Sequence, residues 1–227
     1  MNWKRIAHRG APLIAKENTI DSFSKAINAG AKWVELDVLL SKDNIPFVFH
    51  DLSLHRMIGK RIKAESLIFE ELRELCMPRL LIPSLKEVME LFEQNQVKVY
   101  LEIKSKNKAI VKEVVKVAES HDVEKVYSSF HHPHLRSIKS MDKNLKTMGL
   151  AKYTWNISKK LIERNDIDEV GVSLQGSKSP GMNFFVERNI PVFVYTVNKQ
   201  EEEDALKIKK ASGIFTDTFG KEVLLRN

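Results

Sequence analysis

The sequence predicts a single (β/α)8 barrel, and three of its features carry that prediction. Short apolar, β-branched runs alternate with amphipathic stretches along the 227 residues, as in parallel strands joined by helices. Eight such runs occur, which is the number of strands in a barrel of about 250 residues. No glycine-rich phosphate loop follows the first run, so an open, doubly wound nucleotide-binding sheet is less favoured.

The alternation places the strands and helices in order along the chain. The expected strands are Arg5–His8, Trp33–Val38, Val97–Lys104, Lys125–Ser128, Lys146–Leu150, Glu169–Ser173, Pro191–Thr196 and Gly213–Thr216. The expected helices between and after them are Thr19–Ala29, Lys108–Ser120, Pro133–Ser140, Ser158–Arg164, Pro180–Arg188, Glu201–Lys209 and Lys221–Leu225.

One region interrupts this alternation. Residues 51–96 separate the second and third barrel strands and contain helical patterns at Leu67–Leu75 and Leu85–Gln94. We therefore expect one domain, residues 1–227, with a small inserted helical subdomain at about 51–96. Loops after barrel strands lie on the catalytic face, so an insertion there can shape the substrate mouth.

Composition narrows the class of protein. Hydrophobic residues make up 43% of the chain and charged residues 30%, which is typical of a globular protein. No apolar stretch approaches the roughly 20 residues that span a bilayer, and the start Met1–Arg5 carries no signal-peptide pattern. We therefore expect a cytoplasmic protein without stable membrane insertion. The single cysteine, Cys76, cannot form an internal disulfide, which agrees with that compartment.

The net charge of +7 has two interpretations. A basic field could steer an anionic phosphodiester or hold the protein near an anionic surface, or the lysines could form an ordinary solvated surface. The lysines are spread along the chain beside glutamates, and no basic run alternates with aromatics. A nucleic-acid partner is therefore not expected. The sequence leaves the oligomeric state open, a homo-oligomer included.

Three carboxylates and a lysine are expected on the inward face of neighbouring strands. Because side chains alternate along a strand, Glu35 and Asp37 share one face, and Glu102 and Lys104 also share a face. Carboxylates that converge inside a barrel repel each other and lose hydration unless they are neutralised. One divalent cation with oxygen ligands, Mg²⁺ or Ca²⁺, would neutralise them, and salt bridges at the barrel end are the alternative.

Two histidines follow apolar runs at positions where a barrel presents side chains to its substrate. His8 ends the first strand and is followed by Arg9 and Gly10, and His50 follows the run Phe47–Phe49. Histidine suits proton transfer near neutral pH, and arginine suits two-pronged contact with phosphate. Together with the carboxylates, they favour a catalytic site over isolated structural histidines.

A longer series of residues at fixed spacing resembles the signature of the glycerophosphodiester phosphodiesterase family. Its first part is His8-Arg9-Gly10, Glu17-Asn18-Thr19, Phe23, Ala26, Gly30-Ala31, Glu35-x-Asp37-Val38, Ser41-Lys42-Asp43 and His50-Asp51. Its second part is Ile82-Pro83-Ser84-Leu85-x-Glu87-Val88, Glu102-Ile103-Lys104, Ser128-Ser129-Phe130, Val194-Tyr195-Thr196-Val197-Asn198 and Gly213-Ile214-x-Thr216-Asp217. The chain departs from the signature where Met57 and Ile58 precede Gly59 in place of threonines, where Tyr195 replaces tryptophan, and where Phe219 replaces proline.

The resemblance implies metal-dependent hydrolysis of a small-molecule glycerophosphodiester to sn-glycerol 3-phosphate and an alcohol. It implies metal ligation by Glu35, Asp37 and Glu102, acid-base catalysis by His8 and His50, and phosphate contact by Arg9 and Lys104. It further implies that Glu17 orients Arg9 or contributes to the metal site, and that Tyr195 walls the substrate pocket.

Several alternatives stay open at this level. The nucleophile is either water or the substrate's own glycerol hydroxyl, and either histidine could be the base. A lysophospholipase-D-like enzyme, which acts on lysolipids, is a rival function, as is a catalytically inactive barrel that binds phosphodiesters. The head-group preference lies in loop shapes that the sequence does not reveal.

Overall fold

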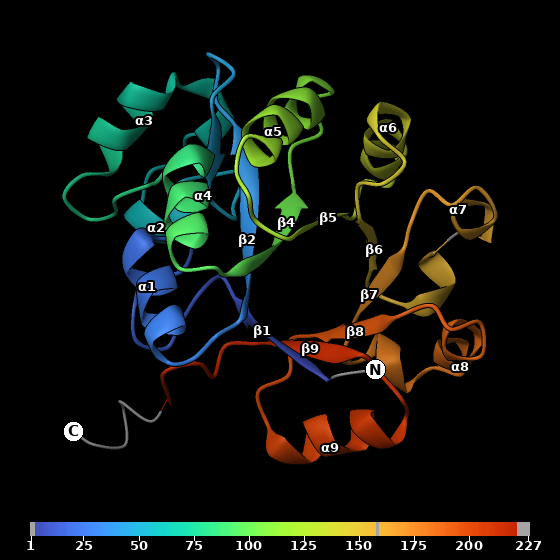
Figure 1. Ribbon diagram of the computed structural model, residues 1–227. Coiled ribbons are helices and arrows are strands. Elements are labelled where there is room, and N and C mark those ends of the chain that lie inside the picture. The colour runs from blue at the N-terminus through green and yellow to red at the C-terminus, as the bar shows by residue number, and fades with distance from the viewer. Residues whose placement is uncertain (1–2, 158, 222–227) are drawn as a thin grey trace.

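The chain forms the predicted barrel of parallel strands with helices outside it (Figure 1). The computed structural model describes residues 3–157 and 159–221. The barrel strands in this part of the chain are β1 (Lys4–His8), β2 (Trp33–Leu40), β4 (Lys98–Ile103), β5 (Lys125–Ser129), β6 (Thr147–Ala151), β7 (Glu169–Ser173), β8 (Val192–Tyr195) and β9 (Gly213–Thr216). They follow one another in chain order, and β1 pairs with both β2 and β9. That double pairing closes the sheet.

The helices cover the outer surface of the barrel. They are α1 (Ile20–Asn28), α4 (Leu85–Gln94), α5 (Ala109–Glu119), α6 (Pro133–Met141), α7 (Lys159–Glu163), α8 (Gly181–Val186) and α9 (Gln200–Ile208). Their apolar faces pack against the outward side chains of the strands to form the main core. Helix starts follow local capping: the Thr19 hydroxyl accepts from the Ser22 N–H at α1, and Ser84 and Glu87 form a capping box at α4.

The observed limits of the predicted strands and helices differ from the expected ones by at most two residues. The expected helix Lys221–Leu225 lies outside the described residues, apart from Lys221. Within the described part of the chain, no helix has the length and apolar character needed to cross a bilayer.

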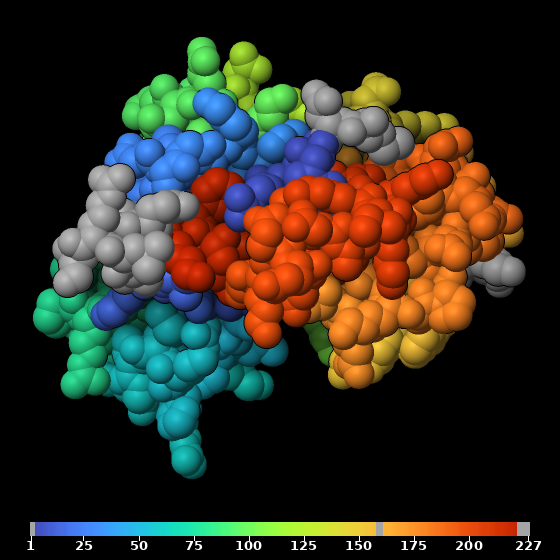
Figure 2. All heavy atoms as spheres, turned by 90° about the horizontal axis from the view of Figure 1, so that it is seen from below, coloured from blue at the N-terminus to red at the C-terminus, as the bar shows by residue number. Residues whose placement is uncertain are grey.

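The segment between β2 and α4 has a small core of its own. It contains β3 (Pro46–Val48), α2 (His55–Ile58) and α3 (Phe69–Cys76), with Leu54, Leu72 and Cys76 buried together. The sequence pattern does not predict β3 or α2, because three or four residues are too few to show a strand or helix period. In Figure 2, the teal atoms of this segment gather at one side of the face seen from below. The subdomain limits of about 51–96 stay a prediction.

Aromatic side chains fill the inside of the barrel. The rings of Trp33 on β2 and Tyr100 on β4 lie 5.1 Å apart, and Tyr100 also contacts Phe193 and Phe215. Glu102 lies two residues beyond Tyr100 on β4, so its side chain points to the same interior. The aromatic layer therefore forms a floor under the polar groups at the carboxyl ends of the strands.

Candidate active site

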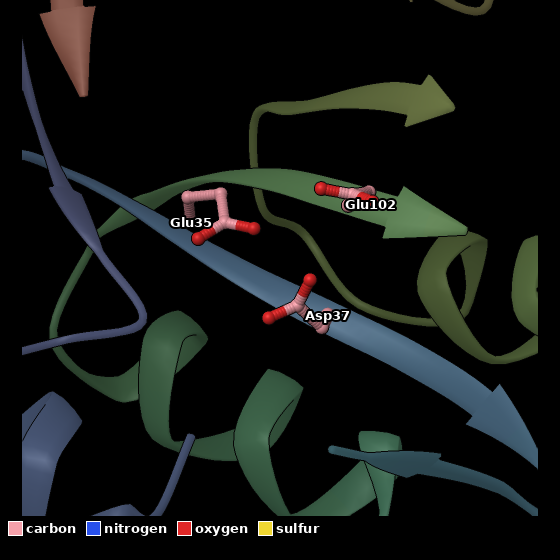
Figure 3. Close-up of side chains that lie close together, drawn as sticks. All are labelled: Glu35, Asp37 and Glu102. Atoms are coloured by element: carbon pink, nitrogen blue, oxygen red, sulfur yellow. The ribbon is translucent and has the colours of Figure 1, made fainter. Parts of the chain in front are cut away.

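Three carboxylates converge at the carboxyl ends of β2 and β4. The pairing of these strands sets Asp37 directly beside Glu102, and Glu35 lies two residues earlier on β2. One oxygen from each of the three groups lies within 4.8 Å of the others (Figure 3). Asp37 is fully buried, and its Oδ1 accepts no hydrogen bond, although Nζ of Lys104 lies 3.4 Å from it. A buried carboxylate oxygen with no hydrogen bond that faces two further carboxylates fits a divalent cation with oxygen ligands.

The electrostatics of the cluster indicate the same ligand. Burial, and then the charge of Asp37, raise the pKa of both Glu35 and Glu102. Burial also opposes ionisation of Asp37, but Arg9 and Lys104 outweigh it and lower the pKa of that group. These cationic side chains thus favour the ionised form of Asp37, whereas Glu35 and Glu102 remain reluctant to ionise. A divalent cation would supply the missing positive charge.

His8 is held at the mouth by an aspartate from the last strand end. Its Nδ1 lies 2.8 Å from Oδ1 of Asp217, and its Nε2 lies 4.0 Å from Oε2 of Glu35. Asn198 donates from Nδ2 to the other oxygen of Asp217 at 2.9 Å. Burial lowers the pKa of His8, but the hydrogen bond to Asp217 and the charge of Glu35 raise it by more. Closure of the barrel between β1 and β9 brings this pair together.

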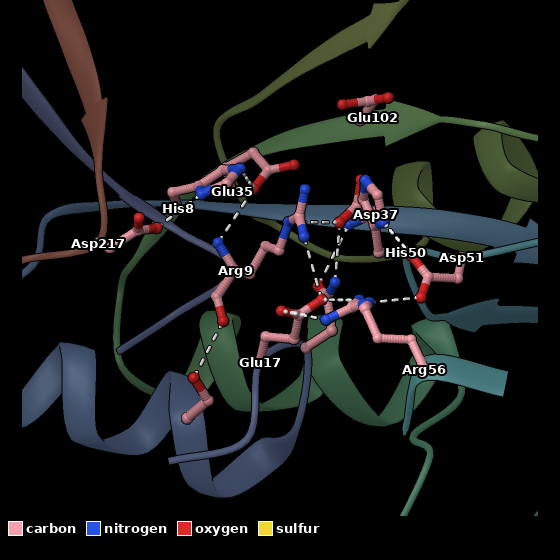
Figure 4. A network of polar contacts seen from close by, with 12 residues as sticks. His8, Arg9, Glu17, Glu35, Asp37, His50, Asp51, Arg56, Glu102 and Asp217 are labelled. Carbon is pink, nitrogen blue, oxygen red and sulfur yellow. Dashed lines mark hydrogen bonds and ion pairs between the residues drawn. The ribbon is translucent and has the colours of Figure 1, made fainter. Parts of the chain in front are cut away.

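A tight turn directs Arg9 over the carboxylates. Arg9 has a left-handed backbone (φ 56°), and Gly10 follows with φ 88°. A Cβ on Gly10 would lie 2.7 Å from the carbonyl carbon of Ser22, so only glycine fits there. The Arg9 N–H donates to Oε2 of Glu35 at 3.0 Å. In this position the guanidinium forms ion pairs with Glu17 at 3.0 Å and with the Asp37 carboxylate at 3.1 Å (Figure 4).

His50 has a second, different aspartate partner. Its Nδ1 lies 2.5 Å from Oδ1 of Asp51, and Oδ2 of Asp51 accepts from Nε of Arg56 at 2.6 Å. Burial lowers the pKa of His50, and the positive charges of Arg9 and Lys104 lower it further, against the opposite effect of Asp37. The two histidines therefore have opposite shifts, because their surroundings differ in charge.

These groups line a cavity of about 190 Å³. Its lining residues are His8, Arg9, Glu35, His50, Glu102, Lys104, Ser128, Phe130, Leu150, Tyr195, Thr196 and Phe215. The Tyr195 hydroxyl donates to the Ala151 carbonyl at 2.8 Å, and the ring of Phe130 packs edge-on against the Tyr195 ring. The cavity thus has charged groups along one part of its wall and aromatic rings along another, which suits a substrate with a phosphate and a carbon chain.

The structure brings the residues singled out in the sequence together, although not all in the same way. Seven of them line the cavity: His8, Arg9, Glu35, His50, Glu102, Lys104 and Tyr195. Asp37 completes the carboxylate cluster, whereas Glu17 lies outside the cavity lining and contacts Arg9. The site also uses residues to which the sequence analysis gave no role. Asn18 donates to Asp37 at 2.8 Å, and Asp51, Asp217 and Arg56 make the contacts described above.

The sequence offered a signal for only some of these additional residues. Asp51 is adjacent to His50, and Asp217 follows a strand at the catalytic end, so both occupy positions where site residues occur. Asn18 stands in the signature motif Glu17-Asn18-Thr19, so the sequence marked its position but not its contact, whereas the contacts of Arg56 on α2 follow from no motif or periodicity.

Comparison with known proteins gives consistent relatives. A family model described as "Glycerophosphoryl diester phosphodiesterase family" matches residues 8–221. A "Glycerophosphodiester phosphodiesterase" of Caldanaerobacter subterraneus subsp. tengcongensis is 29% identical over 237 residues, with 93% of each chain covered. A Macaca fascicularis "Glycerophosphodiester phosphodiesterase domain-containing protein 4" is 24% identical, and the match covers 95% of this chain and 40% of that protein.

Solved structures share the fold over almost the whole chain. The crystal structure of a glycerophosphodiester phosphodiesterase from Thermotoga maritima has a TM-score of 0.84 and 28% identity, with 99% of each chain covered. An Oleispira antarctica phosphodiesterase in complex with the product sn-glycerol-3-phosphate has a TM-score of 0.87 and 24% identity, with 96% of this chain and 94% of that chain covered.

Proposed function

Because this chain belongs to the glycerophosphodiester phosphodiesterase family, we propose that it hydrolyses glycerophosphodiesters to sn-glycerol 3-phosphate and an alcohol. One observation carries the proposal: three carboxylates, two histidines and two cationic side chains meet around one cavity at the catalytic end of the barrel. The Oleispira antarctica protein, which has the same fold, binds sn-glycerol-3-phosphate as its product.

Glu35, Asp37 and Glu102 are the proposed ligands of one divalent cation, Mg²⁺ or Ca²⁺. When bound, this cation would neutralise the cluster and stabilise negative charge on the phosphoryl oxygens. Arg9 and Lys104 line the same cavity and would contact the phosphate from the protein side. In this proposal, Glu17 orients Arg9 through their ion pair.

His8 and His50 are the proposed proton-transfer groups. Each histidine has an aspartate at Nδ1, and the pKa of both Asp217 and Asp51 is lowered: burial raises it, but hydrogen bonds to neighbouring side chains outweigh burial. An ionised aspartate only accepts hydrogen bonds, so Nδ1 of each histidine carries the proton and donates. Nε2 is therefore the ring atom left to exchange a proton with the substrate. One histidine deprotonates the nucleophile and the other protonates the leaving alcohol.

Tyr195 is the proposed wall for the glycerol part of the substrate. Its hydroxyl is engaged by the Ala151 carbonyl, so the residue presents its ring, together with Phe130, to the cavity. The insertion supports the lysolipid alternative less well. Phe69, Leu80 and Ile82 are buried in the small core, whereas Ile68, Met77 and Leu81 are exposed but do not line the cavity.

The experiment measures sn-glycerol 3-phosphate release from glycerophosphocholine and glycerophosphoethanolamine, for wild type and His50→Ala, with EDTA, Mg²⁺ or Ca²⁺. Metal-dependent release that is lost in the variant is the expected result. Release that survives both EDTA and the substitution would contradict the proposed site. If release occurs only from lysolipids, the lysophospholipase-D-like activity replaces the one proposed.

A further inference from the structure

The insertion contributes an arginine, Arg56, that links the loop after β1 to the loop after β3 at the site. Arg56 lies on α2 and bonds two carboxylates from different loops, Asp51 after β3 and Glu17 after β1. Glu17 in turn contacts Arg9, and Asp51 contacts His50. Arg9 and His50 both line the cavity. Figure 4 shows the five side chains as one continuous chain of contacts.

We propose that Arg56 is a positioning residue for the reaction, which sets the orientation of His50 through Asp51 and that of Arg9 through Glu17. Arg56 does not line the cavity. It acts only through the two carboxylates, and the inference rests on the proposed function of His50 and Arg9.

The geometry of the contacts requires the planar fork of an arginine. Nε of Arg56 donates to Oδ2 of Asp51 at 2.6 Å, while its two terminal nitrogens donate to the two oxygens of Glu17 at 2.6 and 3.1 Å. Three donors in one plane thus fix two carboxylates at once, which the single ammonium of a lysine cannot do.

Each carboxylate uses another oxygen contact to hold a cavity residue. Oδ1 of Asp51 lies against Nδ1 of His50, and Oε1 of Glu17 also accepts from Arg9 at 3.0 Å. Both carboxylates are largely shielded from water, with exposed side-chain fractions of 20% and 18%. A fixed Asp51 keeps the Nδ1 proton of His50 in place, and a fixed Glu17 keeps the Arg9 guanidinium over the cluster.

Packing against the small core fixes the position of α2. Buried Leu54 and Ile58 anchor the helix in the small core, and Gly59 ends it with φ 80°. Arg56 is half exposed between these anchors, and its side chain is not part of the small core. Substitution of Arg56 should therefore leave the fold intact and change the site alone.

The test compares Arg56→Ala, Arg56→Lys and a control, Arg73→Ala, in metal-loaded enzyme with glycerophosphocholine. Arg73 lies in the same insertion and pairs with Glu87 at 3.1 Å, outside the cavity lining. We expect kcat/KM to fall by about tenfold to a hundredfold in Arg56→Ala, the range seen when a supporting partner is lost. Arg56→Lys should recover only part of the loss, and Arg73→Ala should match wild type.

Double variants show whether Arg56 acts through its two carboxylates. In an Asp51→Asn, Glu17→Gln background, Arg56→Ala should cost much less activity than in wild type, because the link is already broken. The same loss in both backgrounds would overturn the inference, as would full rescue by lysine.

A spectroscopic readout separates positioning from a general loss of structure. Long-range ¹H–¹⁵N correlation spectra report which ring nitrogen of His50 is protonated. We expect the Nδ1-protonated form in wild type and Arg73→Ala, and a mixture in Arg56→Ala. Inactive His50→Ala beside fully active Arg56→Ala would overturn the positioning role alone. Full activity in His50→Ala would overturn the proposed function and this inference with it.

Discussion

The carboxamide variant Asp217→Asn tests how the proton on His8 is held. Oδ1 of Asp217 faces Nδ1 of His8, while Oδ2 accepts from Nδ2 of Asn198. An asparagine side chain has one acceptor oxygen and one donor amide group. Because His8 and Asn198 both donate, each to a different carboxylate oxygen, the asparagine oxygen can accept from only one of them in this geometry. If its oxygen stays with Asn198, its amide nitrogen faces His8. The proton of His8 must then move from Nδ1 to Nε2, which reverses the roles of the two ring nitrogens.

The expected loss of kcat in Asp217→Asn follows from the proposed proton-transfer role of His8. Acid-base catalysis by a positioned side chain contributes about 10²- to 10⁴-fold, which corresponds to roughly 3 to 5 kcal/mol in the barrier. We expect kcat in Asp217→Asn to fall within that range and KM to change little, because Asp217 does not line the cavity. The protein should remain folded, because the substitution keeps the shape of the side chain.

The assay is steady-state release of sn-glycerol 3-phosphate at saturating metal, together with thermal unfolding. The matched control is Asp204→Asn, the same chemical change on the exposed surface of α9, where Asp204 pairs with Lys207. A folded Asp217→Asn enzyme with kcat within about threefold of wild type would refute the reasoning, because the tautomer of His8 would then not matter.

Three further outcomes are expected. Chelation with EDTA should abolish activity and lower the unfolding temperature, since the proposed cation would bind the folded cluster and not the unfolded chain. Mg²⁺ or Ca²⁺ should restore both, and an unchanged unfolding temperature would argue against a bound cation. Leu72→Ala should destabilise the protein by about 2 to 5 kcal/mol in urea unfolding, because Leu72 is fully buried in the small core, and a loss below about 1 kcal/mol would contradict that packing. Stability should fall with acidification below pH 6.5, because burial lowers the pKa of His134 from its ordinary 6.5; the bond between Nε2 and the Ser105 carbonyl opposes this shift, and the charge of His131 adds to it. The unfolded chain then binds the proton more strongly, and His134→Gln should show a weaker pH dependence than wild type.

The barrel itself was predictable from the sequence because most strands are runs of apolar and β-branched residues bounded by polar turns. The alternation rule also predicted that Glu35 and Asp37 face the same way, and the pairing of β2 with β4 sets Asp37 beside Glu102. Such local rules apply wherever a regular element is long enough to repeat its period.

These local rules do not predict contacts between segments that lie far apart in the sequence. His8 and Asp217 are 209 residues apart, and Arg56 reaches Glu17 across 39 residues of chain. Their meeting depends on barrel closure and on the path of the small core, including the four-residue helix α2. The left-handed backbone of Asn18 (φ 58°), which aims its side chain at Asp37, likewise has no sequence pattern that predicts it.

Pairing between the first and last strands has a consequence for how the enzyme becomes active. His8 leaves the ribosome before its partner Asp217, which follows β9 and lies 209 residues further along the chain. A nascent chain can assemble the carboxylates of β2 and β4 well before it can orient this histidine. Sequence-distant pairings of this kind form slowly and late, so full turnover should appear only after the ring of strands has closed. Catalytic activity would then serve as a direct reporter of complete folding, more stringent than helix content or burial of the aromatic floor.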